Sequence, residues 1–417
     1  MLLNRPQACL LLPLGAAVAL SLTGDSTLYA VLPNQIDVVG IDLAMVGVLL
    51  GANRLIRIPG NLLAGALNDR LGRRRLFLIG LFLGVLSTVS YSLAHGLWPL
   101  LAGRLLWGTA WALINVGGYT MVVDQSTPAD RGRMTGFYQM AFMLGLAISP
   151  LLGGGLTDAL GFRPALRICA AVSGIGLAVA FAALPETRSP AHGPRRRLWS
   201  GTQRQQFAAL VGAFQRLDRQ ILRADYLYLV TLFVSSGVLM STISLYLKQR
   251  VGSGISLDGV LIGVSSMGGM MLTLRALLGM LAGPLAGILS DWCRNRWWVV
   301  RGGILLGITG FVTLALWAGL WAVPVGVALV ALSTGALASA LAALVGDRAT
   351  GSRQGMTIGS LATAGDIGSA TGPLLAYALV SVLDLRWVYL LCAAVLASGL
   401  FAAVGQGPWS DGQCRNG

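Results

Sequence analysis

Residues 136–154 read GFYQMAFMLGLAISPLLGG, and residues 359–377 read GSLATAGDIGSATGPLLAY. Both stretches carry one spaced pattern of small residues followed by a proline, and the copies lie 223 positions apart. The pattern falls on Gly136, Gly145, Ser149, Pro150, Gly153 and Gly154 in the first copy, and on Gly359, Gly368, Gly372, Pro373 and Ala376 in the second. Asp124 and Asp347 keep the same offset. The chain is therefore two copies of a half of about 200 residues.

The bulk composition is that of a chain embedded in lipid. Hydrophobic residues make up 55% of the 417 residues, charged residues only 11%, and the mean hydropathy is +0.73. Soluble domains carry about 25% charged residues. Twelve apolar segments are each long enough to cross about 30 Å of hydrocarbon as a helix. They cover residues 8–33, 43–66, 76–94, 97–122, 134–157, 163–184, 226–247, 260–289, 297–318, 321–345, 356–382 and 386–405.

The character of these segments predicts the fold class. They are rich in Leu, Ala, Gly and Val without alternation, which favours helices over barrel strands. We predict an all-α integral membrane protein with twelve transmembrane helices in two pseudo-symmetric six-helix bundles. The bundles cover residues 1–185 and 226–417 and are joined by a linker at 186–225. The linker contains an amphipathic basic stretch, which we expect to form a helix on the inner leaflet or, alternatively, to bind a partner.

The net charge of +14 is unevenly distributed along the chain. Basic residues gather in alternate loops, whereas the loops at 34–42, 95–96 and 319–320 contain none. The basic loops hold Arg70, Arg73, Arg74, Arg75, Arg131, Arg133, Arg294, Arg296, Arg348 and Arg353. This asymmetry predicts a multi-pass protein whose basic loops and termini are cytoplasmic. It also argues against nucleic acid as a partner. The skewed use of one Lys against 29 Arg and one Glu against 15 Asp is typical of a bacterial protein and indicates the plasma (inner) membrane.

The reactive residues do not predict an enzyme. The five cysteines show no metal-ligand spacing, and the only histidines, His95 and His192, fall in predicted loops. The sequence contains no evident nucleophile–base pair and no phosphate-binding loop. We therefore expect no cofactor and no metal.

A short loop between the second and third segments combines glycine, aspartate and arginine. It reads GALNDRLGRRR over residues 65–75, and we call it the gate loop. Gly65 allows neighbouring helices to approach, Gly72 permits a turn, and Asp69 meets a set of guanidinium donors. A shorter copy, Gly287 with Asp291, stands in the second half without the later glycine and the arginine run.

The gate loop resembles the signature loop of the major facilitator superfamily, Gly-x-x-x-Asp-Arg-x-Gly-Arg-Arg. Arg104 and Gly108 resemble that family's Arg-x-x-x-Gly element. The stretch at 136–154 is similar to the fifth-helix signature of its drug:proton antiporters, with Ser149 in place of a glycine. The resemblance implies the major facilitator fold, in which two bundles rock around a central cavity. It also implies that Asp69 and Asp124 pair with the loop arginines Arg70, Arg73 and Arg74 at a cytoplasmic gate.

Ionisable residues at membrane depth are candidates for function, because burying a charge in hydrocarbon is costly. They are Asp25, Arg54, Arg57, Arg104, Arg275 and Asp366. Asp25 and Arg104 lie at nearly the same depth in the segments 8–33 and 97–122, so we expect them to meet and to couple transport to protons. The alternatives are a fixed structural ion pair, or pairing of Asp25 with Arg54 or Arg57. Asp366 either carries a proton or serves packing.

Polar and aromatic residues share single helical faces in three segments, which indicates a cavity for a partly apolar substrate. The candidates are Tyr29, Trp107, Trp111, Asn115, Tyr119, Ser235, Thr242 and Tyr246, together with Arg54, Arg57 and Arg275. Packing of aromatic residues in the core is the alternative for any single tryptophan. The small residues of the two Gly/Pro stretches are expected to form corresponding seams between the bundles.

These features together predict a secondary transporter that exports a small, partly apolar compound by proton antiport. The alternatives are a transporter of an organic anion or lipid-linked substrate, or a proton symporter. Four intramembrane arginines against two aspartates favour an anion. We expect a functional monomer whose partners are the lipid bilayer, the substrate and protons.

Overall fold

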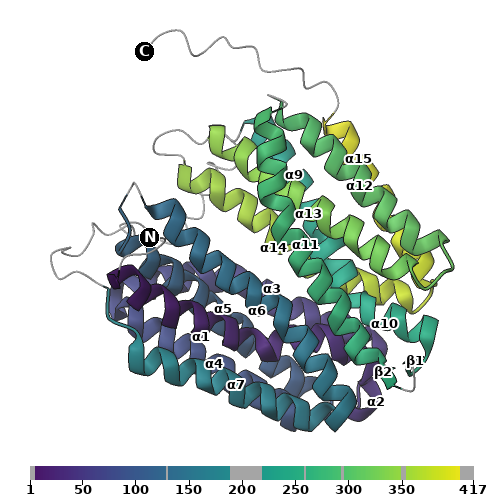
Figure 1. Cartoon of the computed structure of the whole chain (residues 1–417), viewed down its shortest axis with the longest axis horizontal. Coiled ribbons are helices and arrows are strands. Elements are labelled where there is room, and N and C mark those ends of the chain that lie inside the picture. The colour runs from purple at the N-terminus through teal and green to yellow at the C-terminus, as the bar shows by residue number, and fades with distance from the viewer. Residues whose placement is uncertain are drawn as a thin grey trace. The chain divides into compact units, whose positions relative to one another are not determined.

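The computed structural model describes residues 5–127, 130–187, 218–257, 260–292, 295–348 and 354–403. These residues are almost entirely helical (Figure 1). The first half consists of α1 (Arg5–Val31), η1 (Leu32–Asn34), α2 (Ile36–Val39), α3 (Leu43–Leu71), α4 (Arg73–Leu93), α5 (Leu97–Asp124), α6 (Arg131–Leu160) and α7 (Phe162–Ala183). The predicted linker helix falls in residues 188–217, which lie outside the described residues.

The second half repeats this order with one break near its start. It consists of α9 (Arg219–Leu232), η2 (Phe233–Leu239), α10 (Met240–Val251), β1 (Gly254–Leu257), β2 (Val260–Gly263), α11 (Val264–Trp292), α12 (Arg296–Leu316), α13 (Ala322–Arg348), α14 (Gln354–Val380) and α15 (Leu385–Ala403). Each of the twelve predicted segments corresponds to a long helix, with α9, η2 and α10 forming one segment. The prediction of twelve helices is confirmed.

Eleven of the described helices are long and apolar enough to cross a membrane. The twelfth, α14, is 27 residues long but is rich in Gly, Ser and Thr and is not among them. In each half we call the end of the helices where α3 meets α4, or α11 meets α12, the basic end, because of the arginines there. The other end is called the opposite end.

Two local structures differ from the sequence prediction. Residues 260–263, expected to begin a helix, form strand β2, which pairs antiparallel with β1 so that Leu257 faces Val260. The intervening Asp258-Gly259 is a dipeptide typical of two-residue hairpins, and this signal was outweighed by the apolar character of the segment. In addition, η2 is a π-helix of seven residues inside the segment expected to be a regular helix.

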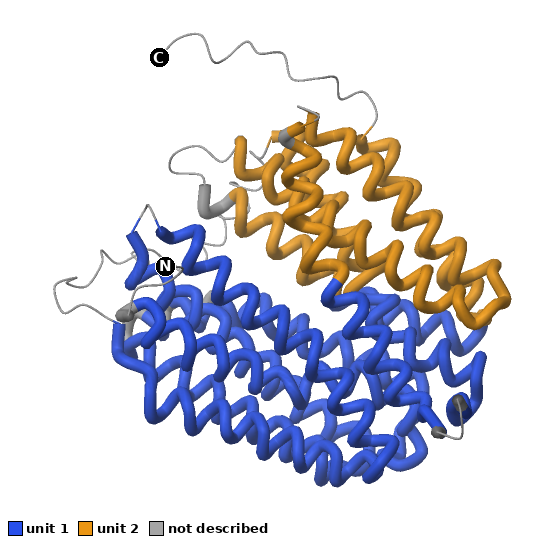
Figure 2. The backbone as a smooth tube through the Cα atoms, in the orientation of Figure 1, with its two compact units in different colours: residues 1–215, 237–277, 370–382 blue, residues 216–236, 278–369, 383–417 orange. Residues whose placement is uncertain are grey.

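The described contacts divide the chain into two compact units (Figure 2). Unit 1 contains residues 1–215, 237–277 and 370–382, and unit 2 contains residues 216–236, 278–369 and 383–417. Unit 1 therefore includes the first half together with the ends of three second-half helices. The division of the sequence at 1–185, 186–225 and 226–417 follows the repeat and stays a prediction.

The repeated glycines perform the same packing task in both units. A Cβ atom at Gly145 of α6 would lie 2.6 Å from Ala19 Cα of α1, so only glycine fits this crossing. A Cβ atom at Gly368 of α14 would overlap the Leu229 carbonyl of α9. Gly136 and Gly359 have no described atom within 4 Å of such a Cβ. The second glycine of each copy thus joins the fifth helix of its half to the first.

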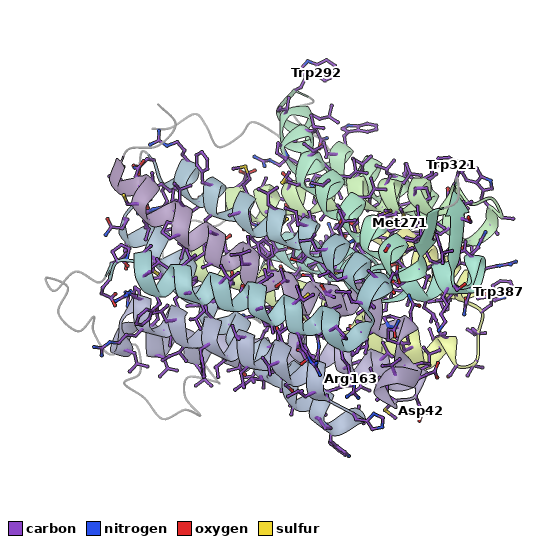
Figure 3. The ribbon with its side chains drawn as sticks, turned by 60° about the horizontal axis from the view of Figure 1, so that its bottom comes forward. Asp42, Arg163, Met271, Trp292, Trp321 and Trp387 are labelled. Atoms are coloured by element: carbon purple, nitrogen blue, oxygen red, sulfur yellow. The ribbon has the colours of Figure 1, made fainter. Side chains whose placement is uncertain are left out.

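Exposed tryptophans mark the two ends of the helices of unit 2 (Figure 3). Trp321 directly precedes α13 and Trp387 lies in the first turn of α15, both at the opposite end, where their side chains point away from the helices. Trp292 ends α11 at the basic end and is 82% exposed. Tryptophan is enriched where the membrane surface meets water, so these side chains delimit a lipid-facing band between them.

Candidate functional site

A buried ion pair joins α1 to α5 inside unit 1. Nη1 of Arg104 donates a hydrogen bond to Oδ1 of Asp25, and the residues are only 1% and 5% exposed. The sequence predicted this meeting from equal depth, and the structure brings the two residues together. Gly24 helps to place the carboxylate, because a Cβ atom there would overlap Thr88 of α4. The helix α1 can therefore lie close to its neighbours at this depth.

Three further bonds hold the ion pair in place. Arg104 donates from Nε to the Leu49 carbonyl of α3 at 2.9 Å and from Nη2 to the Tyr29 hydroxyl at 3.3 Å. The Asn53 amide donates to the same Asp25 oxygen at 3.2 Å. Gly108 makes this arrangement possible, since a side chain there would overlap the Asn53 carbonyl. Asn53 was not predicted from the sequence, where it stands out only as a polar residue directly before Arg54.

The remaining predicted arginines of unit 1 have aromatic and charged neighbours. The guanidinium carbon of Arg57 lies 5.4 Å from the centre of the Trp111 ring, a cation–π contact. Arg54 lies within electrostatic range of both Tyr29 and Arg275. Asp25 is thus paired with Arg104 in this conformation, whereas the alternative pairing of Asp25 with Arg54 or Arg57 stays a prediction.

The aromatic face of α5 belongs largely to the core. Trp107 is 0% exposed and lies 6.2 Å from Trp111, measured between ring centres, while Trp111 lies 5.2 Å from Phe142. Trp107 is therefore a core residue and lines no cavity in this conformation. Farther along the same face, Asn115 is half-buried, and the exposed Tyr119 donates to Gln139 at 2.6 Å.

The polar face predicted for the seventh segment is not continuous. Ser235 of unit 2 accepts a hydrogen bond from Thr334 at 2.7 Å, whereas Thr242 and Tyr246 belong to unit 1. Tyr246 accepts a hydrogen bond from Arg250 and lies under its guanidinium at 4.9 Å. Ser235 lies within the π-helix η2, which changes the residue period between Ser235 and the other two residues, so the three do not follow the predicted single stripe.

Among the described residues, an ion pair lies at the gate loop and another at the matching place of the second half. Arg73 donates from Nε to Asp124 at 3.2 Å and from Nη1 to the Asn68 carbonyl at 2.6 Å. At the matching place in unit 2, Arg296 pairs with Asp347 at 3.0 Å. Arg296 was expected in a basic loop, but its place 223 positions after Arg73 was not recognised, and the second copy thus keeps its ion pair.

The remaining gate-loop residues have distinct surroundings. Gly72 has a φ of 91°, a conformation that favours glycine, and Arg74 donates to the Phe181 carbonyl at 2.6 Å. No described atom lies within 4 Å of a Cβ placed on Gly65, and its role in close helix approach stays a prediction. The side chains of Asp69, Arg70 and Asp291 lie outside the described residues.

Two seams within unit 1 connect the first half to ends of second-half helices. A side chain at Gly154 would overlap the Ser265 carbonyl of α11, and Thr273 of α11 donates to the Ala147 carbonyl at 2.5 Å. Asp158 of α6 accepts a bond from the Ser266 backbone N–H at 2.7 Å. Asp158 thus binds the start of α11, where four backbone N–H groups lack helical partners.

The second seam joins α3 to α14, where glycines of α3 lie against backbone carbonyls of α14. Cβ atoms placed on Gly47 and Gly51 would lie 2.6 Å and 2.7 Å from the carbonyls of Pro373 and Ala370. Pro150 plays the equivalent part in the first seam, where its carbonyl lies against Gly269. Part of each Gly/Pro stretch therefore forms the predicted seam between halves, whereas Gly145, Gly153 and Gly368 pack within their own half.

Comparison with known proteins decides the family. The model of the Major Facilitator Superfamily matches residues 14–274 and 262–406. The chain belongs to this superfamily. Multidrug resistance protein 2 of Bacillus subtilis is 23% identical to the chain over 384 residues, and the alignment covers 90% of each protein. An uncharacterised MFS-type transporter of Mycobacterium tuberculosis is 31% identical over 177 residues, which are 42% of the chain and 25% of that relative.

The solved structures agree on the fold of this facilitator. A bacterial homologue of the human lysosomal transporter Spinster, in an inward-facing and occupied conformation, superposes with a TM-score of 0.72 at 17% identity. The alignment covers 94% of both chains. The chain spans only a quarter of the length of its Mycobacterium relative. The chain is a multi-pass membrane protein of this superfamily, and the prediction that it is not an enzyme is confirmed by its family.

Proposed function

We propose that this facilitator exports a small, partly apolar compound in exchange for protons. The observation that carries the proposal is the buried Asp25–Arg104 pair, which joins α1, α3 and α5 at one point. Asp25 is a carboxylate at membrane depth whose binding of a proton would remove the charge that Arg104 neutralises. The similarity to multidrug resistance proteins supports export as the direction.

The bonds of Arg104 suggest how one proton alters the helices. When Asp25 is ionised, Arg104 Nη1 and Asn53 both bind it and hold α1 against α5 and α3. Protonation weakens these two bonds, because the carboxyl group loses the negative charge that attracts the guanidinium and the amide N–H. Arg104 keeps its bonds to the Leu49 carbonyl and the Tyr29 hydroxyl, whose dipoles continue to stabilise the positive charge of the guanidinium. In this scheme α1 is released while Arg104 stays anchored on α3.

The cytoplasmic gate belongs to the same proposal. With both termini in the cytoplasm of a cell whose inner membrane holds the protein, the basic end faces inward. The Arg73–Asp124 pair then lies at the inner surface, and the seam made by Asp158 and Ser266 lies at the outer surface. The transporter works as a monomer and needs no cofactor besides protons.

An organic anion is a second candidate substrate, and the arginines of unit 1 favour it. Arg54 and Arg275 lie within electrostatic range of each other, and Arg57 lies over Trp111. Asp25 pairs with Arg104, and Arg54, Arg57 and Arg275 are three further guanidinium groups of unit 1. A carboxylate or phosphate with an apolar body would bind such a site through paired N–H donors.

The decisive experiment is a transport panel in proteoliposomes with the full chain. Ethidium serves as the lipophilic cation and carboxyfluorescein as the anion, each measured with and without an imposed pH gradient. Gradient-dependent transport of either probe, reduced at least tenfold by Asp25→Asn, supports proton coupling, with exposed Asp384→Asn as the matched control. Transport of both probes at equal rates with and without the gradient would contradict antiport.

A further inference from the structure

A second buried acid lies in unit 2, outside the pair described above. Asp225 is six residues after the start of α9, about 9 Å from its basic end. It is 8% exposed, and its Oδ1 atom has no hydrogen-bond partner. Among the described residues, the Ser360 hydroxyl of α14 lies within hydrogen-bonding range of this carboxyl. None of the ion pairs among the described residues includes Asp225.

The hydrogen bonds of Ser360 indicate the state of this carboxyl. The Ser360 hydroxyl donates its single proton to the Thr357 carbonyl at 2.9 Å, so its oxygen is left to accept. A protonated Asp225 can donate to that oxygen, whereas an ionised Asp225 would meet an acceptor without a donor. A buried carboxylate with no cation nearby is also strongly disfavoured. The geometry therefore fits a neutral, protonated Asp225.

The other charged groups near α9 are engaged elsewhere or lie at its surface. Arg219 and Arg223 of α9 itself are exposed. From α14, the next acid is the half-buried Asp366, which lies within electrostatic range of Tyr228. From α13, which packs on α9, Asp347 is bound by Arg296.

The remaining neighbour of α9 is α15, which offers no charge near Asp225. Its contact with α9 includes a hydrogen bond of 2.7 Å between Tyr226 and Ser398. The charged residue of α15, Arg386, begins that helix at the opposite end. No described cation from any packed element therefore faces the Asp225 carboxyl.

We propose that Asp225 is a second proton-binding site of this transporter, loaded from the aqueous phase at the basic end. This proposal rests on the proton coupling through Asp25 that is proposed above. The site differs from Asp25 in three respects: it lies in the second half, close to one surface, and its partner is a hydroxyl instead of a guanidinium. The two halves would then each bind a proton, one deep in the membrane and one near the basic end.

Infrared spectroscopy of the full chain in nanodiscs tests the site with the proton itself as probe. The expected result is a carbonyl band of a protonated carboxyl at pH 7 in the wild type and in Asp384→Asn, and its loss in Asp225→Asn. The band shifts when D2O replaces water and disappears as the pH is raised, because the proton exchanges with solvent. If Asp225→Asn does not fold, Asp225→Glu replaces it in the test. This variant keeps a carboxyl, so its carbonyl band should remain but at a shifted frequency.

Two results would overturn the proposal. Identical spectra of the wild type and Asp225→Asn at every pH would show that the carboxyl is ionised throughout. A band that is lost in Asp225→Asn but responds to neither D2O nor pH would show a permanently neutral structural group. The band must also survive Asp25→Asn. Loss of gradient-driven ethidium transport in that variant is the separate test of the proposed function, so the two can fail independently.

Discussion

The two halves of the chain share one pattern of glycines but treat their buried acids differently. In the first half Asp25 is paired with Arg104 and bound by Asn53. In the second half the buried acid is Asp225, whose neighbour is the Ser360 hydroxyl. The position 223 residues after Arg104 is Val327, so the second half lacks the guanidinium. The repeat thus preserves backbone packing, whereas the charged groups have diverged.

The largest effect is expected where a charge loses its partner. Arg104→Ala leaves Asp25 buried without a cation and should destabilise the protein by about 3–5 kcal/mol, because an uncompensated buried charge is left behind. Asp225→Asn removes a carboxyl that has no cation and should change stability by less than about 1 kcal/mol. Thermal unfolding in detergent measures both. Equal losses of stability in the two variants would break the comparison.

Glycine substitutions test the shared part of the repeat. Gly145→Ala and Gly368→Ala each place a Cβ against backbone atoms of the first helix of their half, Ala19 and Leu229. Each should cost about 1–3 kcal/mol, since the overlap forces a backbone shift. Gly136→Ala and Gly359→Ala, where open space surrounds the Cβ, are the matched controls. A large loss at the controls, or none at the crossings, would contradict equivalent packing.

The two seams of unit 1 differ in that Asp158 accepts a backbone hydrogen bond across the first seam. Asp158→Ala removes the acceptor of the Ser266 N–H and should destabilise the start of α11 by about 1 kcal/mol, the usual cost of a lost helix cap. The residue 223 positions later is Ser381, which bonds to the Ala378 carbonyl of its own helix. Hydrogen exchange at residues 264–268 should rise in Asp158→Ala but stay unchanged in Ser381→Ala.

The smallest effects concern the two gate ion pairs. Both are partly exposed, with side-chain exposures of 13% and 27% for Arg73 and Asp124, and of 27% and 32% for Arg296 and Asp347. Arg73→Ala and Arg296→Ala should each lower stability by about 0.2–1 kcal/mol, because water screens such pairs. Thermal unfolding would contradict the equivalence if one variant lost several times more stability than the other.

The sequence predicted the twelve helices and the central ion pair because both depend on simple periodic features. Segment length and hydropathy define the helices, and equal depth placed Asp25 beside Arg104. The π-helix could not be foreseen, since it depends on how Phe233–Leu239 packs and not on composition. Asn53 was missed because the search relied on the high free energy of burying charged side chains in the membrane, and asparagine is neutral.

Asp225 was missed for a different reason. The predicted segment began at residue 226, so the acid was assigned to the linker by one position. A carboxyl near the end of a helix has the same sequence context as a solvated residue, and only its burial against α14 distinguishes the two. Trp107 shows the converse error, because a polar-aromatic face of a helix predicts a cavity and a packed core equally well.

The most direct test of the central claim compares two transport modes of Asp25→Asn in proteoliposomes. One mode is accumulation of ethidium, or of carboxyfluorescein if the anion is the substrate, driven by a pH gradient. The other is exchange of labelled for unlabelled probe without a gradient. If Asp25 carries the coupling proton, Asp25→Asn loses the driven accumulation but keeps the exchange. Driven accumulation equal to that of the wild type would contradict the account.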